Sequence, residues 1–308
     1  MKDSIKRIPI SLCGVMLGLA ALGNLLQSYS EGVRYICGIA SGLLLILILL
    51  KLILFPALIK EDMRSPIMAS VSGTFPMALM LLSIYAKPFI GQAAYYIWLF
   101  AIAMHIVLII YFTVNFIVDL QMPQVFASYY IVYVGIAAAA VTAPAYNKPY
   151  IGNTAFLFGF ISMIILLILI TVRYARYQEI PDPVKPLICI YAAPANLCIA
   201  GYIQSSIPKS YELLLILYIL ASVLYVFALV KTIRYFKLPF FPSYASFTFP
   251  FVISAIASKQ TMTSLAGMEH PIPLLKLVVI AETIIAAVFV LYTLVRFLLF
   301  IFTEPQNK

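Results

Sequence analysis

Two ionisable side chains, Glu282 and His105, stand inside long apolar stretches of this sequence. Glu282 lies eleven positions into the stretch 271–302, which is about 16 Å along a helix. A carboxyl group at that depth could carry the proton that couples transport to a proton gradient, or it could be a structural acid bonded to a neighbouring helix. For His105 we expect a packed, neutral imidazole in place of a proton relay.

Catalysis inside a membrane would need several acid, base, nucleophilic or metal-binding groups that converge on one point. The apolar stretches offer one glutamate and one histidine on separate segments, and we find no H-E-x-x-H, G-x-S-x-G or glycine-rich phosphate loop. Cys13, Cys37, Cys189 and Cys198 form no C-x-x-C pair, so we expect small buried side chains. The sequence therefore argues against an enzyme and predicts no metal and no cofactor.

Three phenylalanines, Phe247, Phe249 and Phe251, alternate around Thr248 and Pro250. At about 100° per residue, Phe247 and Phe251 share one helix face and Phe249 points roughly the other way. A phenyl ring in a narrow, dry passage blocks it by size and excludes water. The spacing alone leaves Phe249 and Phe247 as candidate gates, and ordinary packing of Phe249 as the alternative.

An anion that passes between aliphatic walls needs hydrogen-bond donors or a favourable potential, because a fixed buried cation would bind it too tightly for release. Small hydroxyl side chains on the inner stretches and the basic residues at the cytoplasmic rim could supply these. The Asn196 amide could donate to a passing anion or, equally, to backbone that Pro194 frees. The residues that we expect to line a pore or to couple transport are Gly14, Gly18, Asn196, Thr248 and Glu282.

The elements that position these residues follow from composition. Residues of the AVILMFWYC set make up 64% of 308 positions, 10% are charged, and the mean hydropathy is +1.06, so the chain is an integral membrane protein. A helical span needs about 20 apolar residues. We expect one all-α domain, 1–308, with spans at 8–29, 33–55, 66–85, 92–117, 124–143, 152–174, 184–204, 210–233, 243–264 and 271–302. The stretch 8–29 is too long for a signal-peptide core and is expected to be a mature helix.

The 20 Lys and Arg residues divide unequally between the two membrane faces. Because the loops are short, the face with more Lys and Arg should be cytoplasmic. We therefore expect a multi-pass protein of the cell (inner) membrane with both termini in the cytoplasm. The net charge of +9 is spread over membrane-edge clusters, so lipid headgroups, not nucleic acid, are the expected partner. The poorer face carries Arg34, Lys87, Lys148, Lys209, Lys259 and Lys276.

Helix breakers fall on alternate spans. Pro76, Pro144, Pro194 and Pro250 lie in the third, fifth, seventh and ninth spans, and the even spans have no interior proline. Proline removes a helix hydrogen bond, and kinked backbone at membrane depth is tolerated where it is buried in protein or lines a cavity. The pattern predicts five helical hairpins with odd helices inside around a central pore and even helices outside. The alternative is that proline is simply commoner in membrane helices.

Five segments on the odd spans carry a resemblance to a known family. They are IPISLCGVMLGLAALGNLL, SPIMASVSGTFPMALM, QVFASYYIVYVGIAAAAVTAPAY, PLICIYAAPANLCIAGY and SYASFTFPFVISAIAS, of which the F-T-F-P and A-A-P-A-N runs are the most specific. Their order resembles the tellurite-resistance/dicarboxylate transporter family, which includes the slow-type anion channels of plant guard cells. The resemblance implies ten helices with pseudo-fivefold symmetry and a homotrimer with a pore in each subunit. It also implies a phenylalanine plug from the ninth span, which by its position before the proline is Phe249.

Two transport functions follow as expectations. The first is an anion channel that conducts small inorganic or carboxylate anions through a pore within each subunit. The second is a proton-coupled carrier for dicarboxylates or tellurite-type oxyanions. The absence of a second broken-helix repeat aimed at a midplane site favours the channel, whereas Glu282 favours the carrier.

Overall fold

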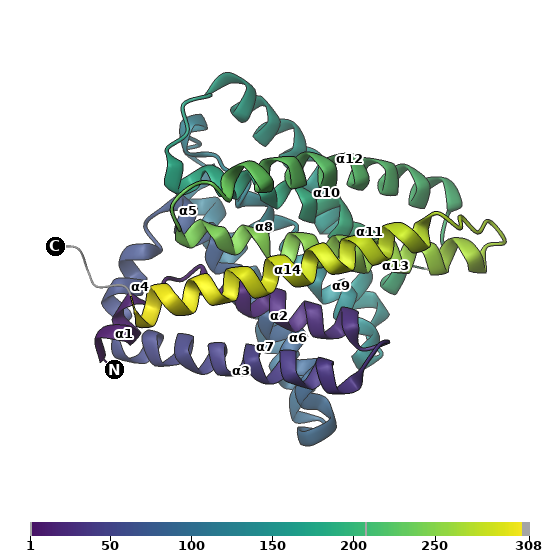
Figure 1. Ribbon diagram of the computed structural model, residues 1–308, viewed down its shortest axis with the longest axis horizontal. Helices are drawn as coiled ribbons and strands as arrows, with labels where there is room; N and C mark the ends of the chain where they lie inside the picture. Colours follow the sequence, from purple (N-terminus) through teal and green to yellow (C-terminus); the bar gives the residue numbers. More distant parts are fainter. Residues whose placement is uncertain (1, 207, 304–308) are drawn as a thin grey trace.

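The computed structural model describes residues 2–206 and 208–303. Lys308, one of the basic residues that we expect on the richer, cytoplasmic face, lies outside the described residues. The protein is 83% helix, and the residues described here contain no strand (Figure 1). Within these described ranges, seven helical stretches are long and apolar enough to cross a membrane, as an integral membrane protein requires. They are Glu31–Leu54, Pro66–Ile90, Ala93–Ile117, Pro149–Arg176, Asp182–Ser205, Tyr211–Tyr235 and Leu275–Phe302.

Five of the elements are long helices with little interruption. They are α3 (Glu31–Leu54), α7 (Ala93–Phe112), which continues as the π-helical turn η1 (Thr113–Ile117), α10 (Pro149–Arg176), α12 (Tyr211–Tyr235) and α14 (Leu275–Phe302). Their most apolar parts are only 28–39% buried. Large side chains such as Ile53, Ile168 and Leu277 are 64–73% exposed on them, which is the surface that lipid would cover.

The remaining apolar segments are short or broken. Near the N-terminus, α1 (Lys2–Arg7) is followed by α2 (Leu12–Leu26), which is shorter than the expected span 8–29 because Pro9 stands between them. The chain then runs through α4 (Pro56–Asp62) before the broken pair α5 (Pro66–Ser72) and α6 (Thr74–Ile90). The fifth expected span is cut into pieces. These are η2 (Met122–Gln124), α8 (Tyr129–Tyr133), η3 (Gly135–Ala137), α9 (Ala138–Thr142) and η4 (Ala143–Tyr146).

The last two broken segments share one design, in which a 3₁₀ helix leads into an α-helix. η5 (Asp182–Ala192) precedes α11 (Ala193–Ser205), and η6 (Pro242–Phe247) precedes α13 (Phe249–Gly267). Pro194 and Pro250 each lie in the first turn of the α-helix, where the missing N–H of proline costs nothing. These prolines therefore begin a new helical segment and do not bend a continuous one.

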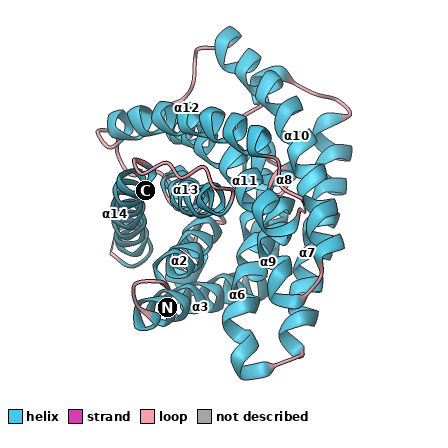
Figure 2. Ribbon diagram, turned by 90° about the vertical axis from the view of Figure 1, so that its right-hand side faces the viewer, coloured by secondary structure: helices cyan, strands magenta, loops and turns pink. Residues whose placement is uncertain are grey.

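The broken segments are also the more buried ones. The most apolar part of Asp182–Ser205 is 94% buried, and that of Pro66–Ile90 is 61% buried. Figure 2 shows α2, α6, α9, α11 and α13 grouped about a common centre, with α3, α7, α10, α12 and α14 towards the outside. Irregular backbone therefore lies within the protein, where its polar groups can find partners.

Candidate functional site

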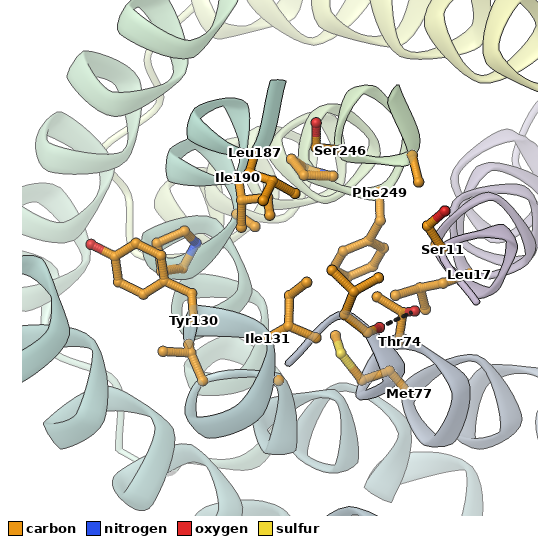
Figure 3. Close-up of a pocket in the computed structure, with 18 of the residues that line it drawn as sticks. Ser11, Leu17, Thr74, Met77, Tyr130, Ile131, Leu187, Ile190, Ser246 and Phe249 are labelled. Carbon is orange, nitrogen blue, oxygen red and sulfur yellow. Dashed lines mark hydrogen bonds between the residues drawn. The ribbon is translucent and has the colours of Figure 1, made fainter. Parts of the chain in front are cut away.

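A small apolar chamber lies among the short and broken segments (Figure 3). Its volume is about 50 Å³, room for no more than a few water molecules. Each of the five broken or short segments contributes to its wall. The lining residues are Ser11, Gly14, Leu17, Val71, Thr74, Met77, Tyr130, Ile131, Val134, Gly135, Leu187, Ile190, Ala193, Pro194, Leu197, Ser243, Ala245, Ser246, Phe249 and Pro250.

A larger polar chamber adjoins it. Its volume is about 510 Å³, and amide, hydroxyl and cationic side chains form part of its wall. The lining residues are Ala21, Asn24, Leu25, Gln27, Arg34, Leu81, Ile84, Ala138, Val141, Thr142, Leu197, Ile203, Gln204, Phe249, Ile253, Ile256, Lys259, Gln260, Thr263 and Ser264.

Phe249 and Leu197 are the two residues that line both chambers. Phe249 is the first residue of α13 and is 7% exposed, while Leu197 lies on α11 and is 3% exposed. Figure 3 shows the Phe249 ring among the labelled residues, with Ile131 and Ile190 on one side and Leu17 on the other. An aromatic ring and an aliphatic side chain thus form the partition between the two spaces.

The backbone at Thr248 directs the Phe249 ring to this partition. Thr248 has φ −100° and ψ −93°, outside the helical region, where η6 ends and α13 begins. Its hydroxyl group, Oγ1, lies 2.9 Å from the Gly14 carbonyl oxygen and 2.7 Å from that of Ala245. Thr248 itself is fully buried and holds the turn against α2.

The other two phenylalanines of the run face the outer helices. The Phe247 ring lies 4.7 Å from the Tyr244 ring and 5.4 Å from the Phe236 ring, centroid to centroid. The Phe251 ring lies 4.8 Å from the Phe289 ring of α14. Both side chains are fully buried and line neither chamber, so their aromatic contacts are packing contacts.

Asn196 is occupied by protein partners. Its Nδ2 donates to the Ala192 carbonyl oxygen and to Ser254 Oγ, both at 2.8 Å. The Ser254 hydroxyl donates in turn to the Pro250 carbonyl oxygen at 2.8 Å. This network joins α11 to the first turn of α13, the two elements that carry Leu197 and Phe249. Asn196 therefore helps to hold the partition in place, and it lines neither chamber.

The two ionisable groups at membrane depth also lie away from the chambers. Glu282 of α14 is 6% exposed and faces Ser258 of α13, whose hydroxyl oxygen is 3.2 Å from Tyr218 Oη. His105 is fully buried, with Nε2 2.9 Å from the Val132 carbonyl oxygen, as we expected for a packed histidine. All four cysteines are free and buried, again as expected.

Gly14 and Gly18 allow α2 to approach the start of α13. Gly14 lines the apolar chamber, whereas a Cβ at Gly18 would lie 2.7 Å from Thr248 Cβ and 3.2 Å from the Phe249 backbone nitrogen. The first distance is shorter than real Cβ contacts, and the second is tighter than most of them, so Thr248 would have to move. Gly18 therefore determines where the turn that carries Phe249 can sit.

We expect the Gly18→Ala variant to be less stable than the parent by about 1–3 kcal/mol, because the added methyl group forces Thr248 and the turn outward. The measurement is the thermal unfolding midpoint of the purified protein in detergent. Gly42→Ala is the matched control, since nothing lies within 4 Å of a Cβ at that position of α3. A Gly18→Ala protein as stable as Gly42→Ala would contradict the close contact.

Hydrogen-bond donors remain free on the wall of the apolar chamber. In the described part of the chain, Ser11 Oγ and Ser243 Oγ are buried and have no hydrogen-bond partner. A buried hydroxyl group without a partner is uncommon in proteins, and these two are available as hydrogen-bond donors on the chamber wall. The sequence pointed to Ser243 only as one of several hydroxyl residues on the inner stretches. It did not single out Ser11 or Leu197, because nothing local distinguishes them from neighbouring serines and leucines.

A family model described as "Voltage-dependent anion channel" matches residues 7–298. A comparison with curated proteins finds no match. The matched residues run from the end of α1 to the last turns of α14 and include every residue that lines the two chambers.

Proposed function

Because this chain belongs to the voltage-dependent anion channel family, we propose that it conducts small anions through a pore formed by the apolar and polar chambers of one subunit. Phe249 is the plug of this pore. The observation that carries the proposal is the position of Phe249 in the wall of both chambers. Phe247, the alternative plug, packs against Tyr244 and Phe236.

We further propose that the pore is enclosed by five helical hairpins, each with one inner and one outer helix. The inner helix is the short or broken segment in each case, and the residues that line the apolar chamber come from these five segments alone. The outer helices are α3, α7, α10, α12 and α14, which carry exposed apolar side chains. On this arrangement the chain crosses the cell (inner) membrane ten times with both termini in the cytoplasm, and the resemblance implies a homotrimer.

The chemistry of the pore is weak binding. On the apolar side of the partition there is no fixed cation among the described residues, since the lining of the apolar chamber contains hydroxyl groups but no Lys or Arg. An anion there would be held by hydroxyl donors such as Ser11 and Ser243, which are weak enough to release it. Such a pore would select among anions by their size and by the free energy needed to remove their water, and it would not recognise one substrate tightly.

The reversal potential of currents across a planar bilayer tests this function. The protein used is the Phe249→Ala variant, in which the plug is removed. With a potassium chloride gradient across a bilayer that contains it, an anion pore gives a reversal potential near the chloride equilibrium potential. Replacing chloride by nitrate on one side should move that potential, while replacing potassium by a large organic cation should not. Currents that follow the cation would refute the proposal.

A proton-coupled carrier of dicarboxylates or tellurite-type oxyanions is the second candidate, and Glu282 is the observation that favours it. A buried carboxyl group on α14 could bind and release a proton during transport. However, Glu282 lines neither chamber and faces Ser258, on the side of α13 towards α12 and α14.

We therefore expect Glu282→Gln to leave anion conduction within about twofold of its parent, because the amide keeps the shape of the carboxyl group and removes its ability to bind and release a proton. The measurement is anion flux into proteoliposomes together with the internal pH. Tyr218→Phe, which removes a hydroxyl group from the same cluster, is the control for packing. Flux that depends on a pH gradient and disappears in Glu282→Gln would instead establish the carrier.

A further inference from the structure

The polar chamber has an unbalanced charge. Two cationic side chains, Arg34 and Lys259, line it, and its lining includes no Asp or Glu. The amide groups of Asn24, Gln204 and Gln260 provide further donors on the same wall. A water-filled space that is lined by cations and walled by low-dielectric protein attracts anions.

Arg34 is the cation that protein groups partly neutralise. Its guanidinium lies 3.5 Å from a Glu31 carboxylate oxygen, 3.4 Å from Asn24 Oδ1 and 4.9 Å from the centre of the Tyr85 ring. Its side chain is 11% exposed, whereas that of Glu31 is 57% exposed. Arg34 is therefore fixed in position, and the Glu31 carboxylate balances part of its positive charge.

Lys259 has no carboxylate partner among the described residues. Its Nζ contacts Ser28 Oγ and lies 3.4 Å from the Leu25 carbonyl oxygen. Within the residues that the structure describes, no Asp or Glu oxygen comes within 4.0 Å of it; the ion pairs there are Arg34–Glu31 and Lys185–Asp182. Its other neighbour is the Tyr29 ring, whose centre lies 5.5 Å from Nζ. These partners are all uncharged, so the positive charge of Lys259 is not balanced at the wall of the chamber.

The position of Lys259 relative to the plug suits collection of anions. Lys259 follows Phe249 by ten residues on α13, about 15 Å along the helix axis. A cation at that distance raises the anion concentration in the chamber without holding an anion at the constriction, where tight binding would stop conduction. The chamber, at about 510 Å³, has room for an anion with several of its waters.

We propose that the polar chamber is an anion-binding vestibule in which Lys259 is the principal charge and Arg34 the second. Its ligand is a small inorganic anion that is still largely hydrated, with chloride and nitrate as the probes. This inference rests on the proposed function for its purpose, but the positive potential that attracts the anion can be measured without any conduction.

A reporter thiol inside the vestibule measures the local potential. Thr263 lines the same chamber one helical turn after Lys259, so the Thr263→Cys protein can be modified there with methanethiosulfonate reagents of opposite charge. The native cysteines are all buried, and the parent protein gives the background rate. The charge of Lys259, about 6 Å from the reporter thiol, should speed modification by the anionic reagent about threefold and slow modification by the cationic reagent about threefold. Lys259→Gln should therefore lower the ratio of the anionic to the cationic modification rate about tenfold at low salt.

Three controls make the result specific. Lys259→Arg should keep the ratio, and Lys276→Gln, which removes an equal charge outside the chamber, should leave it unchanged. Raising sodium chloride or nitrate to about 1 M should abolish the difference between Lys259 and Gln, because salt screens the charge. A ratio that is the same with Lys259 and with Gln at low salt would overturn the vestibule. If the rate ratio depends on Lys259 as expected but the protein passes no anion current, the vestibule stands and only the proposed function is contradicted.

Discussion

Truncation of Phe249 to alanine is expected to raise the anion conductance at least about tenfold, from a nearly closed parent to an open pore. The ring lies in the wall between an apolar chamber of about 50 Å³ and a polar chamber of about 510 Å³. Its removal joins the two spaces and lets water enter a passage that was dry. Single-channel recording in planar bilayers under a chloride gradient measures the change.

The matched control is Phe247→Ala, which removes the same ring two residues earlier. Phe247 is fully buried against Tyr244 and Phe236 and lines neither chamber. Its loss should cost about 3–5 kcal/mol of stability and open no pore. If Phe247→Ala conducts and Phe249→Ala does not, the plug has been assigned to the wrong face of the ninth span.

The alternation of prolines was the part of the fold that the sequence revealed most clearly. Pro76, Pro144, Pro194 and Pro250 all lie in segments that are short or broken in the structure, because proline cannot continue an α-helix without losing a hydrogen bond. Periodicity could not show that Pro194 and Pro250 begin new α-helices after 3₁₀ turns. That detail depends on tertiary contacts such as Thr248 with Gly14.

Chemistry that looked unusual in the sequence was a weaker guide to the site. Glu282, His105 and Asn196 attracted notice because polar groups are rare in apolar stretches, yet each contacts protein groups outside the chambers. Lys259 was predicted only as a cation of the poorer membrane face. Its place in the polar chamber follows from the direction of α13, which the sequence pattern does not specify.

Leu197 is the clearest residue that sequence reasoning missed, since it is one of many leucines and follows the more conspicuous Asn196. Only the packing of α11 against α13 brings it to the partition beside Phe249. A partition built from two side chains predicts that bulk added to one can replace bulk removed from the other. This expectation separates a steric plug from a specific requirement for phenylalanine at position 249.

In the Phe249→Ala background, we therefore expect Leu197→Phe to reduce the conductance about tenfold or more, back towards that of the parent. The new ring starts from the α11 wall of the same partition and can fill the space that the Phe249 ring has left. Ile190→Phe is a control of similar bulk that lines the apolar chamber alone, and it should block less. Because the two partition residues share one space, their effects on conductance should be strongly non-additive in a double-mutant cycle. Additive effects would show that Leu197 does not face Phe249 across the conducting path.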